Sequence, residues 1–263
     1  MDVLIVGAGS MGTWFGRALE GDVAFADLDR DAAASAAESV GGTVADLEGD
    51  DRYDVVCLAV PMTYVSEAID AHADRAERAL VDVSGIMDAP LQAMAKRAPD
   101  RERVSLHPLF APERAPGSIA VVRDQPGPTT DALLETLEGR GNDVFETTAA
   151  EHDEAMETVQ AATHAAVLSF ALAASPAPDG FETPIYDGLT DLVEQVTEGT
   201  PRVYADIQAS FDGADAVADA AAELAGADPA DIESLYREAA NRWHGDNEPE
   251  TEDAATDTAG ESE

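Results

Sequence analysis

The amino-acid sequence predicts an α/β fold in which a parallel sheet domain is followed by an all-helical domain. Three observations predict it. Short β-branched runs alternate with helical segments up to about residue 147, as in right-handed β–α–β units. A glycine-rich loop, GAGSMG at 7–12, stands between the first such run and the first helical segment. After residue 148 the strand-like runs cease, and long alanine-rich segments with helical periodicity replace them.

The first domain, residues 1–147, is expected to be a sheet with helices on its faces. Residues 2–6, DVLIV, form its first strand, and the nearly continuous apolar run DVVCLAVP at 54–61 is typical of a buried parallel strand. The other predicted strands lie at 22–27, 41–46, 79–84, 103–108, 118–122 and 143–147. Helices are predicted up to about Glu20, at 30–39, after Pro61, at 89–97 and at 129–139.

The second domain, residues 148–244, is expected to be helical. Residues 149–174 read as one long helix, and SPAPDG at 175–180 ends it. Helical periodicity returns at 185–198, 201–226 and 228–243. The part from 161 to 174 is apolar nearly all round, which indicates burial on every side, in a bundle core or a dimer interface. Residues 245–263 are acidic and lack large apolar side chains, so we expect a disordered tail.

The charge of the chain is its most unusual property. Asp and Glu number 54 against 15 Lys and Arg, a formal net charge of −39, and Lys96 is the sole lysine. Repulsion on this scale destabilises a compact fold, but at molar salt the Debye length falls to about 3 Å and screens it. Because the acids are spread along the chain, we expect a halophilic, cytoplasmic protein, with a basic partner as the alternative. Nucleic acid binding is not expected, since it needs a basic face.

The remaining composition points to a soluble protein of a reducing compartment. Cys57 is the single cysteine, so neither an intrachain disulfide nor a CxxC motif is possible. The 263 residues contain no apolar run of about 18, and the first ten lack a basic segment. No membrane span and no signal peptide are therefore expected.

The glycine loop predicts a dinucleotide site of the Rossmann type, because a strand precedes it, a helix follows it, and Asp27 ends the second strand. Gly7 permits the tight turn, Gly9 lets the backbone approach a pyrophosphate, and Gly12 allows close helix–strand packing. Asp27 would accept hydrogen bonds from a ribose and repel a 2′-phosphate, which favours NAD over NADP. The predicted cofactor-binding residues also include Ser10 and Met11 in the loop, and Val60 and Pro61 at the end of the fourth strand.

Two alternatives stay open for this loop. A nearby Arg30 could accommodate the 2′-phosphate of NADP. The loop could also be a glycine turn in a fold that binds no nucleotide, and Pro61 could simply terminate its strand.

His107 is the predicted general base. It follows a strand and precedes Pro108 within SLHPLFAP, so it is expected at the carboxyl edge of the sheet, facing the nicotinamide. A neutral histidine there can take a hydroxyl proton while hydride leaves the same carbon. The alternative is a structural His-Pro turn.

The helix from 149 carries a second set of polar residues. His152, Met156, Gln160 and His164 follow each other at intervals of four residues along one slowly turning face. For His152 the alternative to a site residue is a solvated position near the start of the helix. His164 is either a core histidine or a site residue. No HExxH motif is present, and no metal is predicted.

Six segments of the chain form a recognisable series. They are GAGSMG, VDVSGIMDAPLQAM (81–94), SLHPLFAP (105–112), EHDEAMETVQAATH (151–164), TPIY (183–186) and VYADI (203–207). In order and spacing they resemble the prephenate dehydrogenase family, in particular the dehydrogenase part of chorismate mutase–prephenate dehydrogenases. The likeness covers about residues 2–243.

The resemblance implies a Rossmann domain, a helical domain that forms a homodimer, and oxidative decarboxylation of prephenate to 4-hydroxyphenylpyruvate in tyrosine biosynthesis. It makes His107 the catalytic histidine, puts His164 near the substrate, and places Gln160 beside it.

Three positions depart from the family pattern. Many members have serine at Gly85, where it supports the catalytic histidine; Ser84 is adjacent and could take its place. Many have lysine at Met87. Gln195 stands where the family often has an arginine that holds a substrate carboxylate, and glutamine brings a hydrogen bond but no charge. The candidate cations are Arg114, Arg202 and Arg242.

Other functions remain open at this level. Arogenate could be oxidised by the same residues. Another two-domain NAD(P) enzyme is a second possibility, such as a hydroxyacid dehydrogenase or a ketopantoate or pyrroline-carboxylate reductase, although hydroxyacid and ketopantoate enzymes usually need a lysine from the interdomain helix. A nucleotide-sensing regulator would need the glycine loop but not His107.

Overall fold

The computed structural model describes residues 1–175, 177–178 and 180–244, and the predicted tail at 245–263 lies outside them. Contacts group the described residues into two compact units, one of residues up to Asp215 and one of residues from Ala216 to His244. The domain boundary expected at residue 147 stays a prediction. No helix within the described ranges is both long and apolar enough to cross a membrane.

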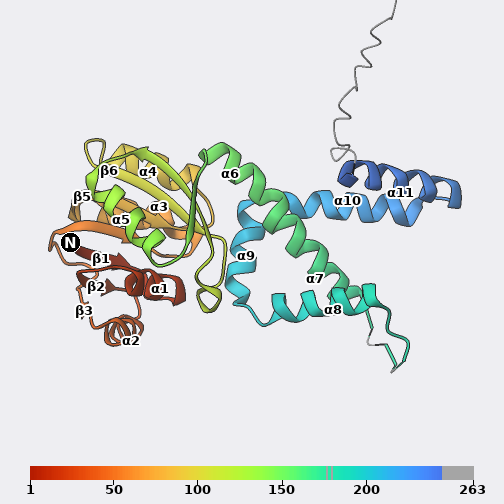
Figure 1. Ribbon diagram of the computed structural model, residues 1–263, viewed down its shortest axis with the longest axis horizontal. Helices are drawn as coiled ribbons and strands as arrows, with labels where there is room; N and C mark the ends of the chain where they lie inside the picture. Colours follow the sequence, from red (N-terminus) through yellow and green to blue (C-terminus); the bar gives the residue numbers. More distant parts are fainter. Residues whose placement is uncertain (176, 179, 245–263) are drawn as a thin grey trace, which may run out of the picture. The chain divides into compact units, whose positions relative to one another are not determined.

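An eight-stranded sheet dominates the N-terminal part of the chain (Figure 1). Its strand order is β3-β2-β1-β4-β5-β6-β7-β8, so the chain winds outward from β1 in both directions. The strands are β1 (Asp2–Val6), β2 (Asp22–Ala26), β3 (Thr43–Val44), β4 (Tyr53–Leu58), β5 (Ala76–Val83), β6 (Glu102–Pro108), β7 (Ser118–Gln125) and β8 (Asp143–Glu146).

Helices cover both faces of this sheet, and alternate residues of each central strand point to opposite layers. Val3 and Ile5 of β1 pack with α1, α2 and α5, whereas Leu4 and Val6 pack with α3 and α4. These helices are α1 (Ser10–Ala18), α2 (Arg30–Val40), α3 (Val65–His72), α4 (Asp88–Arg97) and α5 (Pro128–Gly139). The predicted doubly covered α/β sheet is confirmed.

One part of the strand prediction is wrong. The sheet is parallel from β3 to β6, but β7 runs antiparallel to β6, and β8 is parallel to β7. The connection between β6 and β7 contains only the 3₁₀ turn Pro112–Arg114 and no crossover helix. A parallel return needs a long crossover connection, so this short loop reverses the chain.

A remote carboxylate caps α5. Glu102 of β6 accepts hydrogen bonds from the backbone N–H groups of Thr129 and Thr130 at 2.9 and 2.7 Å. It also accepts one from the hydroxyl of Thr129 at 2.9 Å. A Cβ on Gly127 would lie 2.4 Å from Cδ of Glu102, so glycine is required beside this cap.

Replacing Glu102 with glutamine should therefore lower the free energy of unfolding by about 1–2 kcal/mol, because a charge-assisted cap becomes a neutral one. The denaturant midpoint measures the change. Glu38→Gln, at an exposed position of α2, is the control for removing one negative charge from so acidic a chain. Equal midpoints for the two variants would contradict the cap.

After β8 the described chain consists of helices and the loops that join them. Residues 149–173 form a continuous helical stretch made of α6 (Ala149–Met156), a π-helical turn (Glu157–Ala162) and α7 (Thr163–Ala173). The single long helix predicted here is confirmed, apart from its π-helical turn. It is followed by α8 (Pro184–Thr197), α9 (Pro201–Ser210), α10 (Gly213–Gly226) and α11 (Pro229–His244).

Two helical predictions need correction. The periodic stretch 201–226 is two helices, because Phe211 is extended and buried while Gly213 packs directly on the backbone of the π-helical turn. Burial on every side of 161–174 is also wrong within this chain. Only Ala161 and Val167 are buried there, and Leu172 is 89% exposed.

Candidate active site

The glycine loop forms a tight turn after β1. Gly7 has a φ of +106°, and a Cβ there would lie 2.3 Å from the carbonyl oxygen of Ala59. A Cβ on Gly12 would lie 2.1 Å from the carbonyl oxygen of Gly7. The space beside Gly9 is open, with no atom within 4 Å of an added Cβ. This N-cap glycine brings no side chain to the first N–H groups of α1, at Ser10 and Met11, so an anion could bind them.

Asp27 ties the end of β2 to this loop. One carboxylate oxygen accepts a hydrogen bond from the N–H of Ala8 at 2.7 Å, and the other accepts one from Asp29 at 2.8 Å. The predicted pairing of glycine loop and acid is thus present in space. Arg30 is exposed at the start of α2.

Val60 and Pro61 follow β4 in the chain. Val60 is partly buried against the core beneath α3 and α4. Pro61 is exposed and is the N-cap residue of the 3₁₀ turn Met62–Tyr64, whereas β4 itself already ends at Leu58.

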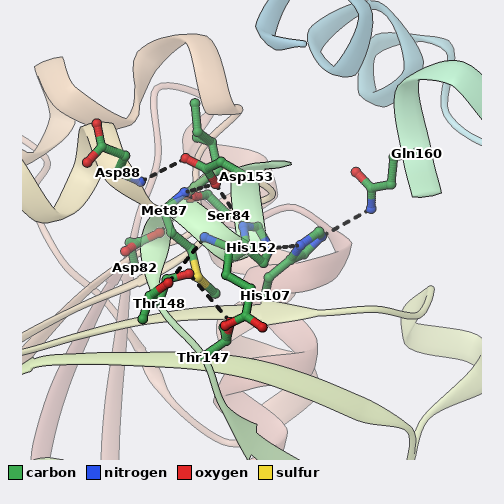
Figure 2. Close-up of polar contacts among 12 residues, drawn as sticks. Asp82, Ser84, Met87, Asp88, His107, Thr147, Thr148, His152, Asp153 and Gln160 are labelled. Carbon is green, nitrogen blue, oxygen red and sulfur yellow. Dashed lines mark hydrogen bonds and ion pairs between the residues drawn. The ribbon is translucent and has the colours of Figure 1, made fainter. Parts of the chain in front are cut away.

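His107 is the next-to-last residue of β6 and is 7% exposed. Its Nδ1 lies 2.8 Å from Nε2 of His152, whose Nδ1 lies 2.8 Å from Oδ1 of Asp153 (Figure 2). The same carboxylate accepts the backbone N–H groups of Met87 and Asp88 at 3.0 and 3.1 Å. A chain of hydrogen bonds therefore runs from the N-terminus of α4 through Asp153 and His152 to His107. We call these last three residues the relay.

The proton positions in the relay can be deduced from the ionisation state of Asp153. The pKa of Asp153 is lowered: burial would raise it, but hydrogen bonds from His152, Asp88 and Met87 outweigh burial. An ionised carboxylate only accepts, so a neutral His152 imidazole donates through Nδ1 and accepts through Nε2. His107 must then donate through Nδ1, which leaves its Nε2 as an unprotonated acceptor.

Burial lowers the pKa of His107 to about 3, with a further contribution from His152, while Asp153 opposes the shift. The imidazole is thus neutral at physiological pH, as a base must be before it takes a proton.

Gln160 contacts the free nitrogen of that base. Its Nε2 lies 3.3 Å from Nε2 of His107, and since the imidazole nitrogen accepts, the amide donates. Gln160 lies in the π-helical turn, a local feature frequent at functional sites. The side chain of Gln208 donates to the carbonyl of Ala161 at 2.9 Å, and Gly213 allows close backbone approach. These contacts from α9 and α10 hold the turn in place.

His164 lies one helical turn beyond Gln160. It makes an edge-to-face contact with the ring of Tyr204, with centroids 4.8 Å apart. Burial lowers its pKa. Within the described residues, the Oε1 atom of Gln160 and the Nδ1 atom of His164 are buried without a hydrogen-bond partner. Both could therefore bind a polar ligand.

Ser84 does not take the place of a serine at position 85. Its hydroxyl oxygen lies 2.5 Å from Oδ2 of Asp82 and 2.8 Å from the carbonyl of Ile86, not beside His107. Burial raises the pKa of Asp82 to about 7. A Cβ on Gly85, in contrast, would lie 3.5 Å from Nε2 of His107 and 2.7 Å from the sulfur of Met62. Met62 therefore occupies the space that a side chain at this position would need.

The remaining predicted substrate contacts are scattered. Gln195 is exposed on α8, and Arg114 is exposed in the 3₁₀ turn after β6. Arg242 belongs to the second unit, where it pairs with Glu238. Arg202, on α9, donates to the hydroxyl of Thr63 at 3.0 Å, next to Met62.

His152 and Asp153 were not among the site residues predicted from the sequence. The solvated position considered as the alternative for His152 is wrong, since His152 is 3% exposed and α6 packs against α4. A usable signal was present: Thr148 caps α6, which fixes the helical phase, and His152 then shares a face with the buried Met156. Among the residues that the structure describes, no three His, Cys, Asp or Glu side chains gather as a metal site requires.

Comparison with known proteins agrees with this arrangement, although no protein-family model matches the chain. A 4-amino-4-deoxyprephenate dehydrogenase from Streptomyces pristinaespiralis is 35% identical over 235 residues, which cover 81% of this chain and 78% of that protein. A probable arogenate/prephenate dehydrogenase from Methanocaldococcus jannaschii is 24% identical over 78% of this chain. The aligned region spans half the length of that relative.

The fold also matches solved structures. The crystal structure of prephenate dehydrogenase from A. aeolicus, in complex with hydroxyphenyl propionate and NAD+, aligns with a TM-score of 0.68 at 16% identity. The alignment covers 94% of this chain and 93% of that one. A Rossmann-like sheet followed by a helical region is thus a fold that this chain shares with that structure. The 35% identity to a dehydrogenase places the chain among the oxidoreductases. The chain belongs to the prephenate dehydrogenase family.

Proposed function

We propose that the chain catalyses the NAD-dependent oxidative decarboxylation of prephenate to 4-hydroxyphenylpyruvate, a step of tyrosine biosynthesis. The observation that supports it most is the relay. It leaves Nε2 of His107 unprotonated at the carboxyl edge of the sheet, where ligands of such sheets bind.

The proposed chemistry needs one base and no metal. The hydroxyl of the substrate donates to Nε2 of His107, which takes its proton as hydride leaves the carbon that bears the hydroxyl. The ring ketone then accepts the electron pair released when the bond to the ring carboxylate breaks and carbon dioxide departs. His107 returns the proton to the phenolic oxygen, so no net proton is released. Gln160 and His164 are proposed to contact the substrate beside this base.

The glycine loop fits a dinucleotide. The open space at Gly9, the uncapped start of α1 and the acceptor Asp27 are the features that a pyrophosphate and an adenosine ribose need. Bound NAD would supply the hydride acceptor. The negative charge of the Asp27 carboxylate would repel a 2′-phosphate, so we propose NAD over NADP. The exposed Arg30 is the residue that would favour NADP instead.

We propose that the helical part forms a homodimer and that the enzyme works in a salt-rich cytoplasm. The dimer would cover apolar side chains that α7 and α8 leave exposed, including Leu172 and Ile185 at 89% and 79%. The salt proposal rests on the net charge of −39.

Lowering KCl from about 1 M to about 0.1 M, which lengthens the Debye length from about 3 to about 10 Å, should lower Tm markedly. Repulsion between the acidic side chains is then no longer screened. Thermal unfolding followed by circular dichroism in a KCl series measures this. Sucrose at 0.1 M KCl is the control for general stabilisation by a cosolute. A Tm that stays constant or rises as KCl falls would contradict the halophilic assignment.

A second candidate substrate is 4-amino-4-deoxyprephenate, because the relative with 35% identity bears that name. Its amine replaces the hydroxyl on the reacting carbon, and Nε2 of His107 could accept a hydrogen bond from either group.

The experiment follows NADH or NADPH formation by the protein in molar KCl. Prephenate, arogenate and 4-amino-4-deoxyprephenate are compared, each with NAD and with NADP. The highest kcat/KM with prephenate and NAD would support the proposal. A preference for either amine would reassign the substrate, and inactivity with all three, in folded protein, would contradict it.

A further inference from the structure

We propose that Arg202 binds a carboxylate of the substrate. This inference rests on the proposed function, because prephenate carries two carboxylates and the protein around it has a formal charge of −39. A dianion cannot be held in such surroundings without a nearby cation. Gln195 brings no charge and is exposed on α8.

The position of Arg202 brings a cation to the edge of the site. Its guanidinium donates through Nη2 to Oγ1 of Thr63 at 3.0 Å, and it lies over the ring of Tyr64, 5.3 Å from the centroid. The neighbouring Met62 lies close to the base, because a Cβ on Gly85 would contact both the sulfur of Met62 and Nε2 of His107. Arg202 thus lies beside the same turn that borders the base.

The side chain is also held in position. Nε of Arg202 donates to Oδ1 of Asp206 at 2.7 Å, and Asp206 is 5% exposed on the next turn of α9. A guanidinium carries five N–H groups, and these two hydrogen bonds use only two of them. The Arg202 side chain remains 50% exposed, so the remaining donors are open to a ligand.

The other arginines considered for this role are placed less favourably. Arg114 is exposed on a turn after β6, and Arg242 pairs with Glu238 in the second unit. Buried Arg103 donates to three backbone carbonyls and to Asp124, which commits its guanidinium to the fold.

The test compares steady-state kinetics of Arg202→Gln and Arg202→Lys with the wild type, using prephenate and NAD. Loss of a charge-assisted hydrogen bond should lower kcat/KM for prephenate about 10- to 100-fold in Arg202→Gln, mainly through KM. Arg202→Lys should recover part of this loss, since it keeps the charge but not the paired donors. KM for NAD should stay unchanged.

Two controls keep the result interpretable. Arg202→Gln leaves the buried carboxylate of Asp206 without its partner, which could destabilise α9. The double variant Arg202→Gln with Asp206→Asn removes both charges and so avoids a buried unpaired charge. Arg237→Gln breaks an equivalent pair with Glu233 on α11 and should leave the kinetics unchanged.

Hydroxyphenyl propionate, which retains only the side-chain carboxylate, shows which carboxylate Arg202 binds. An inhibition constant that is unchanged in Arg202→Gln points to the ring carboxylate, and a raised one points to the side chain.

An active wild type with an equally active Arg202→Gln would overturn the role of Arg202 and leave the proposed function standing. A rise in KM for NAD alone would assign Arg202 to the cofactor instead. A wild type that neither binds nor oxidises prephenate would contradict the proposed function, and the role of Arg202 with it.

Discussion

Replacing His107 with asparagine should lower kcat for prephenate oxidation by about 10²- to 10⁴-fold, the usual contribution of a general base. Asparagine is a suitable replacement because its amide N–H can lie where Nδ1 of the imidazole lies and can donate to His152. The variant then keeps the contact inside the protein and loses only the acceptor Nε2. Steady-state rates in molar KCl, with NADH binding followed by fluorescence, measure the effect.

The expected pattern is a loss in kcat with NADH affinity retained. Unchanged turnover would show that another group takes the proton, and that His107 is only the structural His-Pro turn considered above. Loss of NADH binding as well would indicate a damaged fold. Thermal unfolding of the variant separates that case, because a merely catalytic loss leaves Tm near that of the wild type.

Much of this site could be predicted because its parts are local in sequence. The loop at Gly7, Gly9 and Gly12 follows directly from a strand-turn-helix pattern, and Asp27 ends the adjacent strand. His107 lies at the carboxyl end of β6 for the same reason: parallel strands place their ends at one edge. The antiparallel direction of β7 could also have been predicted, since the sequence predicts no crossover helix between β6 and β7.

What could not be predicted depends on contacts between distant segments. Asp153 reaches Met87 and Asp88 only because α6 packs on α4, more than 60 residues earlier in the chain. The π-helical turn that carries Gln160 has no sequence signature of its own. It is accommodated by Gln208 and Gly213, about 50 residues further on. Periodicity reports a helix face but not the partner that covers it.

The relay explains how His107 can be oriented without a serine at position 85. A serine hydroxyl there would lie near Nε2 of His107, but Met62 fills that space. Orientation of the imidazole therefore comes from its other nitrogen, through His152 and Asp153. In the proposed reaction the imidazolium of His107 would form in a buried position. Asp153 is the negative charge that the relay brings to it, and this charge opposes the lowering of the His107 pKa by burial.

Replacing Asp153 with asparagine should accordingly lower kcat by about 10²- to 10⁴-fold, although Asp153 touches neither substrate nor cofactor. An asparagine amide facing His152 would reverse both tautomers and leave a proton on Nε2 of His107. Asparagine is also a good residue at a helix N-terminus, so it can still accept a bond from α4 and keep the fold. Asp228→Asn, the same change at the start of α11, is the matched control and should leave kcat unchanged.

The pH profile distinguishes this positioning role from a structural one. Without a working base, solvent hydroxide has to remove the hydroxyl proton, so kcat of Asp153→Asn should climb with pH while the wild type levels off. A variant damaged only in packing would lose the same fraction of activity at every pH, and KM for NAD would rise with it. A flat loss of that kind would contradict the relay, whereas a steep profile with normal NAD binding would assign Asp153 to the proton transfer that His107 performs.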